Sequence, residues 1–241
     1  MNRNLKLIFG IIYILCLGIL LFILFSYLDL KDLTSYSYLK SQSEILTGLK
    51  DKKLILFIIL FFLFSVIWIL LLGFASPIAI LSGFIFGPWL GTVVSVLSFT
   101  AGCTLLYIIA KIFFEEIIVQ NLEKRIEKFK NFFNKNELFY FMMFRFTGGF
   151  GIPFAIQNLI PVLFNMKVKN YFYATLFGLV PTIFIINSLG SGIEKYIDDN
   201  DTLKIADVIL EPSIYWPLIG FIIILIISFF AKQKFFRNEK N

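Results

Sequence analysis

Long apolar stretches alternate with shorter charged segments along this chain. A stretch of about 20 apolar residues is enough for a helix to cross the roughly 30 Å hydrocarbon core of a bilayer. Five stretches approach or exceed that length, over residues 5–28, 54–75, 88–113, 171–189 and 214–231. We therefore expect an all-α polytopic membrane protein with about five transmembrane helices.

Two further apolar segments are interrupted by glycine and proline, one at about 77–87 and one at 138–164. In the first, we expect a turn at 83–87 and a new helix from Pro88, because proline suits the first turn of a helix. The second contains the run FMMFRFTGGFGIPFAIQNL, in which three glycines and Pro153 prevent one continuous helix. Broken helices at membrane depth are tolerated only where protein buries them or where they line a wet cavity. Each segment is therefore predicted to be a re-entrant hairpin.

The two hairpins are expected to enter from opposite faces, which makes the core an inverted repeat of the kind found in many secondary transporters. An ungapped shift of 76 residues (153 − 77 = 76) supports a duplication. It aligns Pro77, Ala79, Ile80 and Gly102 with Pro153, Ala155, Ile156 and Gly178. These identities fall at the hairpin prolines and in the middle of the following helices, where duplicated halves should agree.

Small residues indicate where helices should pack closely. They recur every four residues at Gly83, Gly87 and Gly91, and Gly102 continues the small face. This spacing lets two helix backbones approach each other inside lipid. The same ridge would serve a homo-oligomer as readily as an internal contact. Further along, Gly178 and Pro181 predict a kink in the span 171–189.

Composition and charge exclude several classes of protein. The chain is 59% hydrophobic with only 16% charged residues, which excludes a water-soluble globule. It has no histidine, so the commonest metal ligand and general base are missing. Its cysteines, Cys16 and Cys103, lie in apolar spans without metal-ligand spacing. We therefore expect no metal, no cofactor and no enzymatic activity.

The basic residues favour one orientation in the membrane. Lysine and arginine are frequent in 115–136 and in the C-terminal tail, whereas 191–213 is acidic. Cytoplasmic segments carry the excess of basic residues, so the C-terminus is predicted to be cytoplasmic and 191–213 external. Apolar residues recur every three or four positions in 115–136, which predicts an amphipathic surface helix. The net charge of +6 is thus explained without a nucleic-acid partner, since no soluble basic domain exists to bind one.

Three regions follow from these assignments. Residues 1–53 are predicted to form an N-terminal anchor helix and a polar loop, and 54–192 the core with both hairpins. Residues 193–241 are predicted to hold the external loop, the last transmembrane helix and the basic tail. Five crossings would place the N-terminus outside, although Arg3 and Lys6 favour the cytoplasm.

Arg145 is the principal candidate for a functional residue. A charge at the bilayer centre costs roughly 2.5–3.5 kcal/mol even on insertion scales, so such residues usually serve a function. Its forked guanidinium matches phosphate oxygens. The remaining candidate headgroup site comprises Gly148 and Gly149 at the tip, with Pro153, Phe154, Gln157 and Asn158 on the facing leg. Alternatively, Arg145 only braces the hairpin by bonding the carbonyls of the broken helix, or reaches Glu137.

Several of these motifs resemble a known family. GFIFGPWLG, then Ala101-Gly102, a helix ending in Ala110-Lys111, and finally Arg145, Pro153-Phe154 and Asn158 are similar to the DedA superfamily. The closer similarity is to its VTT-domain branch, often labelled SNARE-associated Golgi protein, over roughly residues 70–192. The resemblance implies facing re-entrant hairpins, a role in membrane homeostasis, and movement of phospholipids or polyprenyl-phosphate carriers.

The chain departs from that family in two ways. Many relatives have a proline shortly after the arginine, where this chain has Gly148-Gly149. Proton-coupled members carry carboxylates near the first hairpin, whereas here no Asp or Glu occurs from Leu54 to Ala110 or from Leu138 to Ser191. The resemblance therefore does not supply groups for a proton relay.

The leading hypothesis is a cell-membrane protein that moves phospholipid or polyprenyl-phosphate headgroups across the bilayer, with membrane lipids as its partners. A second hypothesis is a non-transporting scaffold that recruits partners through 115–136. A third is an ion or small-solute transporter, whose path would need the sparse polar residues Thr100, Thr104, Thr175, Thr182 and Asn187. Each of these more readily bonds a backbone carbonyl of its own helix.

Overall fold

The computed structural model describes residues 53–72 and 74–199, together with single residues and short stretches within 12–48 and 212–226. Most of the predicted N-terminal region 1–53 lies outside the described residues. So do most of the predicted last span and the whole basic tail. The described residues form helices and contain no strand. The elements in chain order are α3 (Leu54–Leu72), α4 (Ser76–Lys135), α5 (Glu137–Phe146), the short 3-10 helix η2 (Gly148–Gly151), α6 (Phe154–Leu163), α7 (Val168–Gly178) and α8 (Val180–Asp199).

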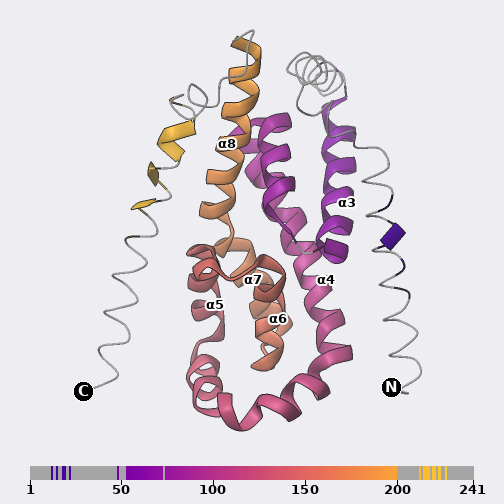
Figure 1. Cartoon of the computed structure of the whole chain (residues 1–241), viewed down its shortest axis with the longest axis vertical. Helices are drawn as coiled ribbons and strands as arrows, with labels where there is room; N and C mark the ends of the chain where they lie inside the picture. The colour runs from indigo at the N-terminus through magenta and orange to yellow at the C-terminus, as the bar shows by residue number, and fades with distance from the viewer. Residues whose placement is uncertain are drawn as a thin grey trace.

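The helices divide between two halves of the molecule. In the view of Figure 1, α3, the beginning of α4 and α8 occupy the upper half, and α5, α6 and α7 occupy the lower half. The second part of α4 runs through both halves and packs mainly against α8 above and against α6 and α7 below. Two described segments, Leu54–Leu71 and Ser76–Phe113, are long and apolar enough to cross a membrane. Taken together as one span, the bent pair α7 and α8 is a third such segment. The expectation of a membrane-spanning helical protein is confirmed.

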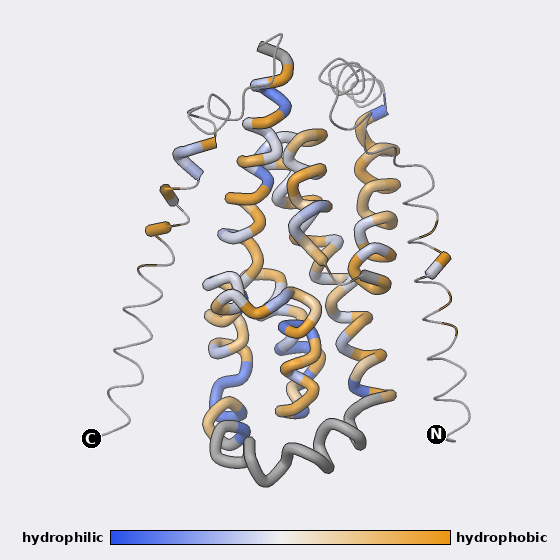
Figure 2. Tube along the Cα trace, in the orientation of Figure 1, coloured by the Kyte–Doolittle hydropathy of each residue, from blue (hydrophilic) through white to orange (hydrophobic). Residues whose placement is uncertain are grey.

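α3 shows most clearly that lipid surrounds this protein. Its 18-residue window has a mean hydropathy of 3.3, yet only 17% of that window is buried inside the structure. Apolar colour accordingly extends along most of α3 in Figure 2. An apolar surface of this size is unfavourable in water but suits a hydrocarbon environment. The predicted span at 54–75 is thus a lipid-facing helix.

α4 reverses direction at Gly87, which adopts φ 75° and ψ −179°. The Ser82 hydroxyl donates a hydrogen bond to the Gly91 carbonyl at 3.1 Å. These residues are nine positions apart and would be separated by about 13 Å in a straight helix. α4 therefore consists of a first arm, residues 76–86, and a second arm, residues 88–135. The turn predicted over 83–87 is observed at Gly87 alone, directly before Pro88, and residues 83–86 remain helical.

The first arm runs antiparallel to α3. The Phe61 ring lies 5.3 Å from the Phe86 ring, and the Trp68 indole donates to the Phe74 carbonyl at 2.9 Å. The chain thus descends through α3 and returns through the first arm, and the end of α3 lies at mid-height in Figure 1. The predicted hairpin at 77–87 is wrong in its bounds. It contains one arm only, because Pro77 lies in the first turn of that arm, where its missing N–H costs nothing.

The lower half contains a second reversal, between α5 and α6. Four consecutive residues have left-handed φ values, namely Gly148 at 68°, Gly149 at 72°, Phe150 at 54° and Gly151 at 79°. No right-handed helix can continue through such a run, and three of its four residues are glycines, which tolerate it. The break predicted within 138–164 is therefore observed, and its tip also lies at mid-height in Figure 1.

The first arm of α4 touches α8 at backbone distance. A Cβ placed on Gly83 would lie 1.9 Å from the Asn187 carbonyl oxygen, and one on Gly190 would lie 2.0 Å from that of Ile80. A Cβ on Gly91 would lie 2.7 Å from the Asn187 Oδ1. Gly83 and Gly91 thus have the predicted packing role. Gly87 does not, because nothing lies within 4 Å of its added Cβ, and its positive φ is what requires glycine.

Candidate functional site

Arg145 lies in the last turn of α5 and is completely buried, with 0% of its surface exposed. Its Nη1 donates to Gln157 Oε1 at 3.1 Å, and its Nη2 donates to Asn158 Oδ1. Nη2 also lies 3.1 Å from the Tyr171 hydroxyl, which in turn donates to Asn158 Oδ1 at 3.2 Å. The guanidinium therefore links α5 to α6 and α7 through neutral oxygens.

Three aromatic rings enclose the guanidinium. Its Cζ is 4.9 Å from the centre of the Phe141 ring, 4.9 Å from that of Phe154 and 5.9 Å from that of Tyr171. Ring faces attract a cation, and more strongly when water is absent. In the part of the chain that the structure describes, Arg145 forms hydrogen bonds to neutral oxygens and none to a carboxylate. The charge is thus offset by amide dipoles and ring faces.

The tip of the second reversal is fastened to this cluster by Gln157. Its Nε2 donates to the Gly148 carbonyl at 3.1 Å and to the Ile152 carbonyl at 2.7 Å. A Cβ on Gly149 would lie 2.2 Å from the Gln157 Cδ, so only glycine fits beneath this amide. Gly148 therefore meets the site as a hydrogen-bond acceptor, and Gly149 as a close neighbour of the Gln157 side chain. Pro153 stands at the start of α6.

Several buried polar atoms of the site have no hydrogen-bond partner within the protein. They are Arg145 Nε, Asn158 Nδ2 and Thr175 Oγ1. Two of the three are obligate donors, so the cluster around the guanidinium has more donors than acceptors. This excess makes the site suited to an anion that enters it.

Other residues of the site have no signal in the sequence. Tyr171 stacks on Tyr107 with ring centroids 4.4 Å apart, and Tyr107 donates to the Met166 carbonyl at 2.6 Å. Tyr171 comes from α7, and only the tertiary fold brings it to Arg145.

Glu137 is not the partner of Arg145, so that alternative is wrong. Its Oε1 accepts from the Lys167 N–H at 3.2 Å and from the Asn170 Nδ2 at 2.6 Å. The carboxylate thus caps the N-terminus of α7, where the exposed backbone N–H groups favour a negative charge. It joins the start of α5 to the start of α7.

Glu137→Ala should lower the free energy of unfolding by about 1.5–3 kcal/mol, because it removes hydrogen bonds to a charged group that is 91% buried. Glu137→Gln should recover part of this loss, since the amide oxygen still accepts. Asn170→Ala removes one of the two partners and should cost less. Thermal unfolding of the purified proteins measures all three, and equal stability of Glu137→Ala and the wild type would contradict the capping role.

Three of the five polar residues considered for a solute path donate a hydrogen bond to a backbone carbonyl. Thr104 donates to the Thr100 carbonyl at 2.7 Å, and Asn187 donates to the Ile183 carbonyl at 2.8 Å, as expected for bonds within their own helices. Thr182 differs, because its hydroxyl reaches the Phe146 carbonyl of α5 at 3.4 Å. The predicted kink at Gly178 is present as a bend of 42° between α7 and α8.

One contact recurs in both halves of the core. A Cβ on Gly178 would lie 2.6 Å from the Arg145 Cβ and 2.7 Å from the Met142 carbonyl oxygen. A Cβ on Gly102 would lie 3.0 Å from the Ile69 Cβ and 3.2 Å from the Val66 carbonyl oxygen. The members of these two sets are each 76 positions apart (178 − 102, 145 − 69 and 142 − 66). Ile69 therefore occupies in the upper half the place that Arg145 has in the lower half.

Gly178→Ala and Gly102→Ala form a matched pair of substitutions. Gly178→Ala should cost about 1–3 kcal/mol of stability by overpacking, because a Cβ there meets both backbone and the base of Arg145. Gly102→Ala should cost less, since its contacts are longer and two of the three are to a side chain. Thermal unfolding compares them, and a larger loss for Gly102→Ala would contradict this packing.

Among the described residues, no group of three or more His, Cys, Asp or Glu side chains could hold a metal ion. The chemistry of the site is therefore that of a buried guanidinium, its amide and hydroxyl partners, and the rings around them.

Comparison with known proteins identifies the family. The VTT domain matches residues 74–192, which contain both arms around Gly87, the Arg145 cluster and most of α8. Over 138 residues the chain is 28% identical to a transmembrane protein 41 homolog of Caenorhabditis elegans, a match that covers 54% of this chain and 55% of that relative. The match thus spans about half the length of the relative, and no solved structure matches the chain. Residues 74–192 are a VTT domain, and the chain belongs to the VTT-domain family of membrane proteins.

Proposed function

We propose that this protein moves phospholipid or polyprenyl-phosphate headgroups across the bilayer, in the manner of a scramblase or flippase. The observation that carries the proposal is the buried Arg145 guanidinium, held beside a helix break by neutral groups only. A permanently charged, forked donor suits a phosphate better than any other membrane component. The proposal includes a location in the cell membrane with the C-terminus in the cytoplasm.

The proposal also includes an inverted repeat of two re-entrant hairpins. One is α3 with the first arm of α4, and the other is α5 with α6. Their tips both lie at mid-height, and they open toward opposite ends of the molecule (Figure 1). The recurring contacts of Gly102 and Gly178, 76 positions apart, support a duplicated origin. In such transporters, broken helices meet near the midplane, where the substrate binds.

In the described conformation Arg145 is closed off from its surroundings. A phosphate would replace the Gln157 and Asn158 oxygens as acceptor, because a bidentate bond from a guanidinium to an anion is stronger than bonds to neutral amides. The unused donors Arg145 Nε and Asn158 Nδ2 would then also gain an acceptor. The left-handed run at 148–151 would supply the movable element, and Gln157 joins it to the cluster by donating to the Gly148 carbonyl. The lipid tails would stay in the membrane.

The test is a vesicle assay with fluorescently labelled lipids and dithionite, which bleaches only the label in the outer leaflet. Purified full-length protein is compared with empty vesicles, using zwitterionic, anionic and polyprenyl-phosphate lipids in parallel. The proposal expects faster bleaching with at least one class and its loss in Arg145→Ala. Normal lipid movement by Arg145→Ala would remove the headgroup mechanism.

A further inference from the structure

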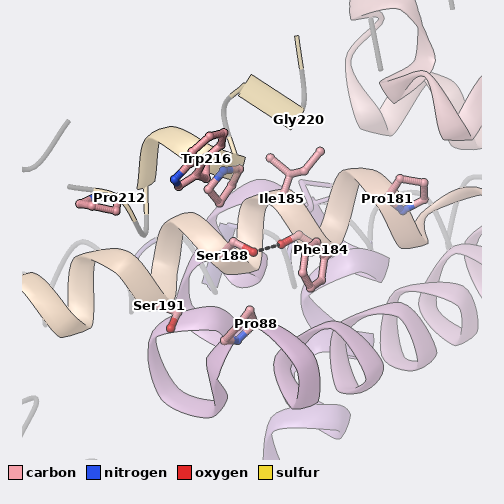
Figure 3. A pocket seen from close by; sticks show the side chains of 10 residues that line it. Pro88, Pro181, Phe184, Ile185, Ser188, Ser191, Pro212, Trp216 and Gly220 are labelled. Carbon is pink, nitrogen blue, oxygen red and sulfur yellow. Dashed lines mark hydrogen bonds between the residues drawn. The ribbon is translucent and has the colours of Figure 1, made fainter. Parts of the chain in front are cut away.

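A groove lies along α8, and its lining does not include Arg145 or the residues bonded to it. It has a volume of about 550 Å³ and is bounded by α8, by Pro88 at the turn of α4 and by C-terminal residues that include Trp216 and Gly220 (Figure 3). Its lining is apolar except for Ser188 and Ser191. The Ser188 hydroxyl already donates a hydrogen bond to the Phe184 carbonyl at 2.8 Å, so its donor has an acceptor within the protein. The groove therefore suits a hydrocarbon occupant.

The length of the groove corresponds to one leaflet. On α8 its lining runs from Pro181 to Ser191, ten residues or about 15 Å at the helical rise. This is half of the roughly 30 Å hydrocarbon core. Pro181 is the second residue of α8, directly after the bend from α7, and α8 rises from that bend to the top of the molecule (Figure 1). An extended lipid tail of one leaflet would occupy the groove along its length.

Two exposed tryptophans flank the apolar part of the groove. Trp89 and Trp216 are 76% and 62% exposed. The Trp89 ring packs 4.8 Å from that of Phe184, which lines the groove. Lys195 follows Ser191 by four residues, on the same face of α8, and its side chain is exposed. A cation thus stands directly beyond the apolar channel.

We propose that this groove binds one acyl chain of a phospholipid, with the lipid phosphate held at Lys195. The inference does not depend on lipid movement, because a lipid can reside here whether or not another passes the Arg145 site. The two residues lie on different helices, Arg145 in the last turn of α5 and Lys195 in the last part of α8. Apolar walls and a terminal cation match a phospholipid better than a flat protein surface.

Gly220 lines the groove, and nothing lies within 4 Å of a Cβ added to it. A leucine at Gly220 would therefore fill part of the groove without clashing at its Cβ. Ser188→Leu would fill it from the α8 side.

Native mass spectrometry of the purified full chain, equilibrated with phosphatidylglycerol and phosphatidylcholine of identical tails, tests the proposal. We expect one retained phospholipid, with about a fivefold preference for the anionic one, because a lysine near the headgroups contributes about 1 kcal/mol. Gly220→Leu and Ser188→Leu should each lower retention severalfold. Lys195→Gln should keep the lipid but lose the preference. Gly48→Leu, at a site that is also open but not part of the groove, is the control for added bulk.

Retention unchanged in both filling variants would overturn the acyl-chain site. An unchanged preference in Lys195→Gln would overturn the headgroup assignment. If Gly220→Leu does not yield folded protein, Ser188→Leu decides the question alone. Arg145→Ala should retain the groove lipid as the wild type does, so loss of movement in that variant and loss of binding in the groove variants report on separate sites.

Discussion

Arg145→Lys protein should insert and fold but move labelled lipid at least about tenfold more slowly than the wild type in the vesicle assay. Lysine keeps the charge but presents a single ammonium in place of a planar fork. Its three N–H groups diverge from a single nitrogen, so it lacks the two parallel donors with which Nη1 and Nη2 reach Gln157 and Asn158 and which match two oxygens of one phosphate. A deficit of about 1.4 kcal/mol in the bound state corresponds to the tenfold loss.

Thermal stability, measured beside lipid movement, distinguishes the two possible roles of Arg145, bracing the reversal and binding a headgroup. If the guanidinium only braces the reversal, Arg145→Lys should lower the melting temperature while lipid movement per folded protein stays normal. If it binds headgroups, movement should fall even in the fraction that remains folded. Lys169→Arg, an opposite exchange at an exposed position, is the matched control and should alter neither property. Movement at the wild-type rate by folded Arg145→Lys would count against bidentate phosphate recognition.

The breaks in the fold could be predicted because few residues tolerate them. Gly87 followed by Pro88 combines a residue free to adopt φ 75° with one that begins a helix well. The run from Gly148 to Gly151 needs four left-handed residues in succession, and three of them are glycines. In both places the requirement is local, so a single sequence reveals it.

The reversal between α3 and the first arm could not be predicted in the same way. Residues 54–75 form an unbroken apolar stretch of the length that a full crossing needs, so length alone favoured a span ending at Ser76-Pro77. What turns the chain is the packing of α3 against the first arm, through Phe61 with Phe86 and Trp68 with Phe74. Those contacts are tertiary, and the hydrophobic pattern does not contain them.

The candidate site likewise contains residues that the sequence predicts and residues that only the tertiary fold brings to it. Arg145, Gln157 and Asn158 were predicted together, because a charge and two amides in an apolar run stand out. Tyr171 lies 26 positions from Arg145 in the chain and was assigned to the start of a span, although it is fully buried against the guanidinium. No spacing rule connects residues that meet only through the docking of α7 on α5.

Gly83→Ala should lower the free energy of unfolding by at least about 3 kcal/mol and the melting temperature by roughly 6–12 °C. An added Cβ would lie 1.9 Å from the Asn187 carbonyl oxygen and 2.5 Å from its carbon. Both atoms belong to backbone in the middle of α8, so no side-chain rotation can relieve the overlap. The first arm and α8 would have to separate along their whole contact.

Gly190→Ala should have a similar effect, because its Cβ would lie 2.0 Å from the Ile80 carbonyl on the same interface. The double variant should then cost less than the sum of the two, since one separation of the arm from α8 relieves both overlaps. Gly18→Ala is the control, as nothing lies within 4 Å of its added Cβ, and alanine there should stabilise the helix by about 0.5–1 kcal/mol. Thermal unfolding of the four proteins would refute the close approach if Gly83→Ala proved as stable as Gly18→Ala.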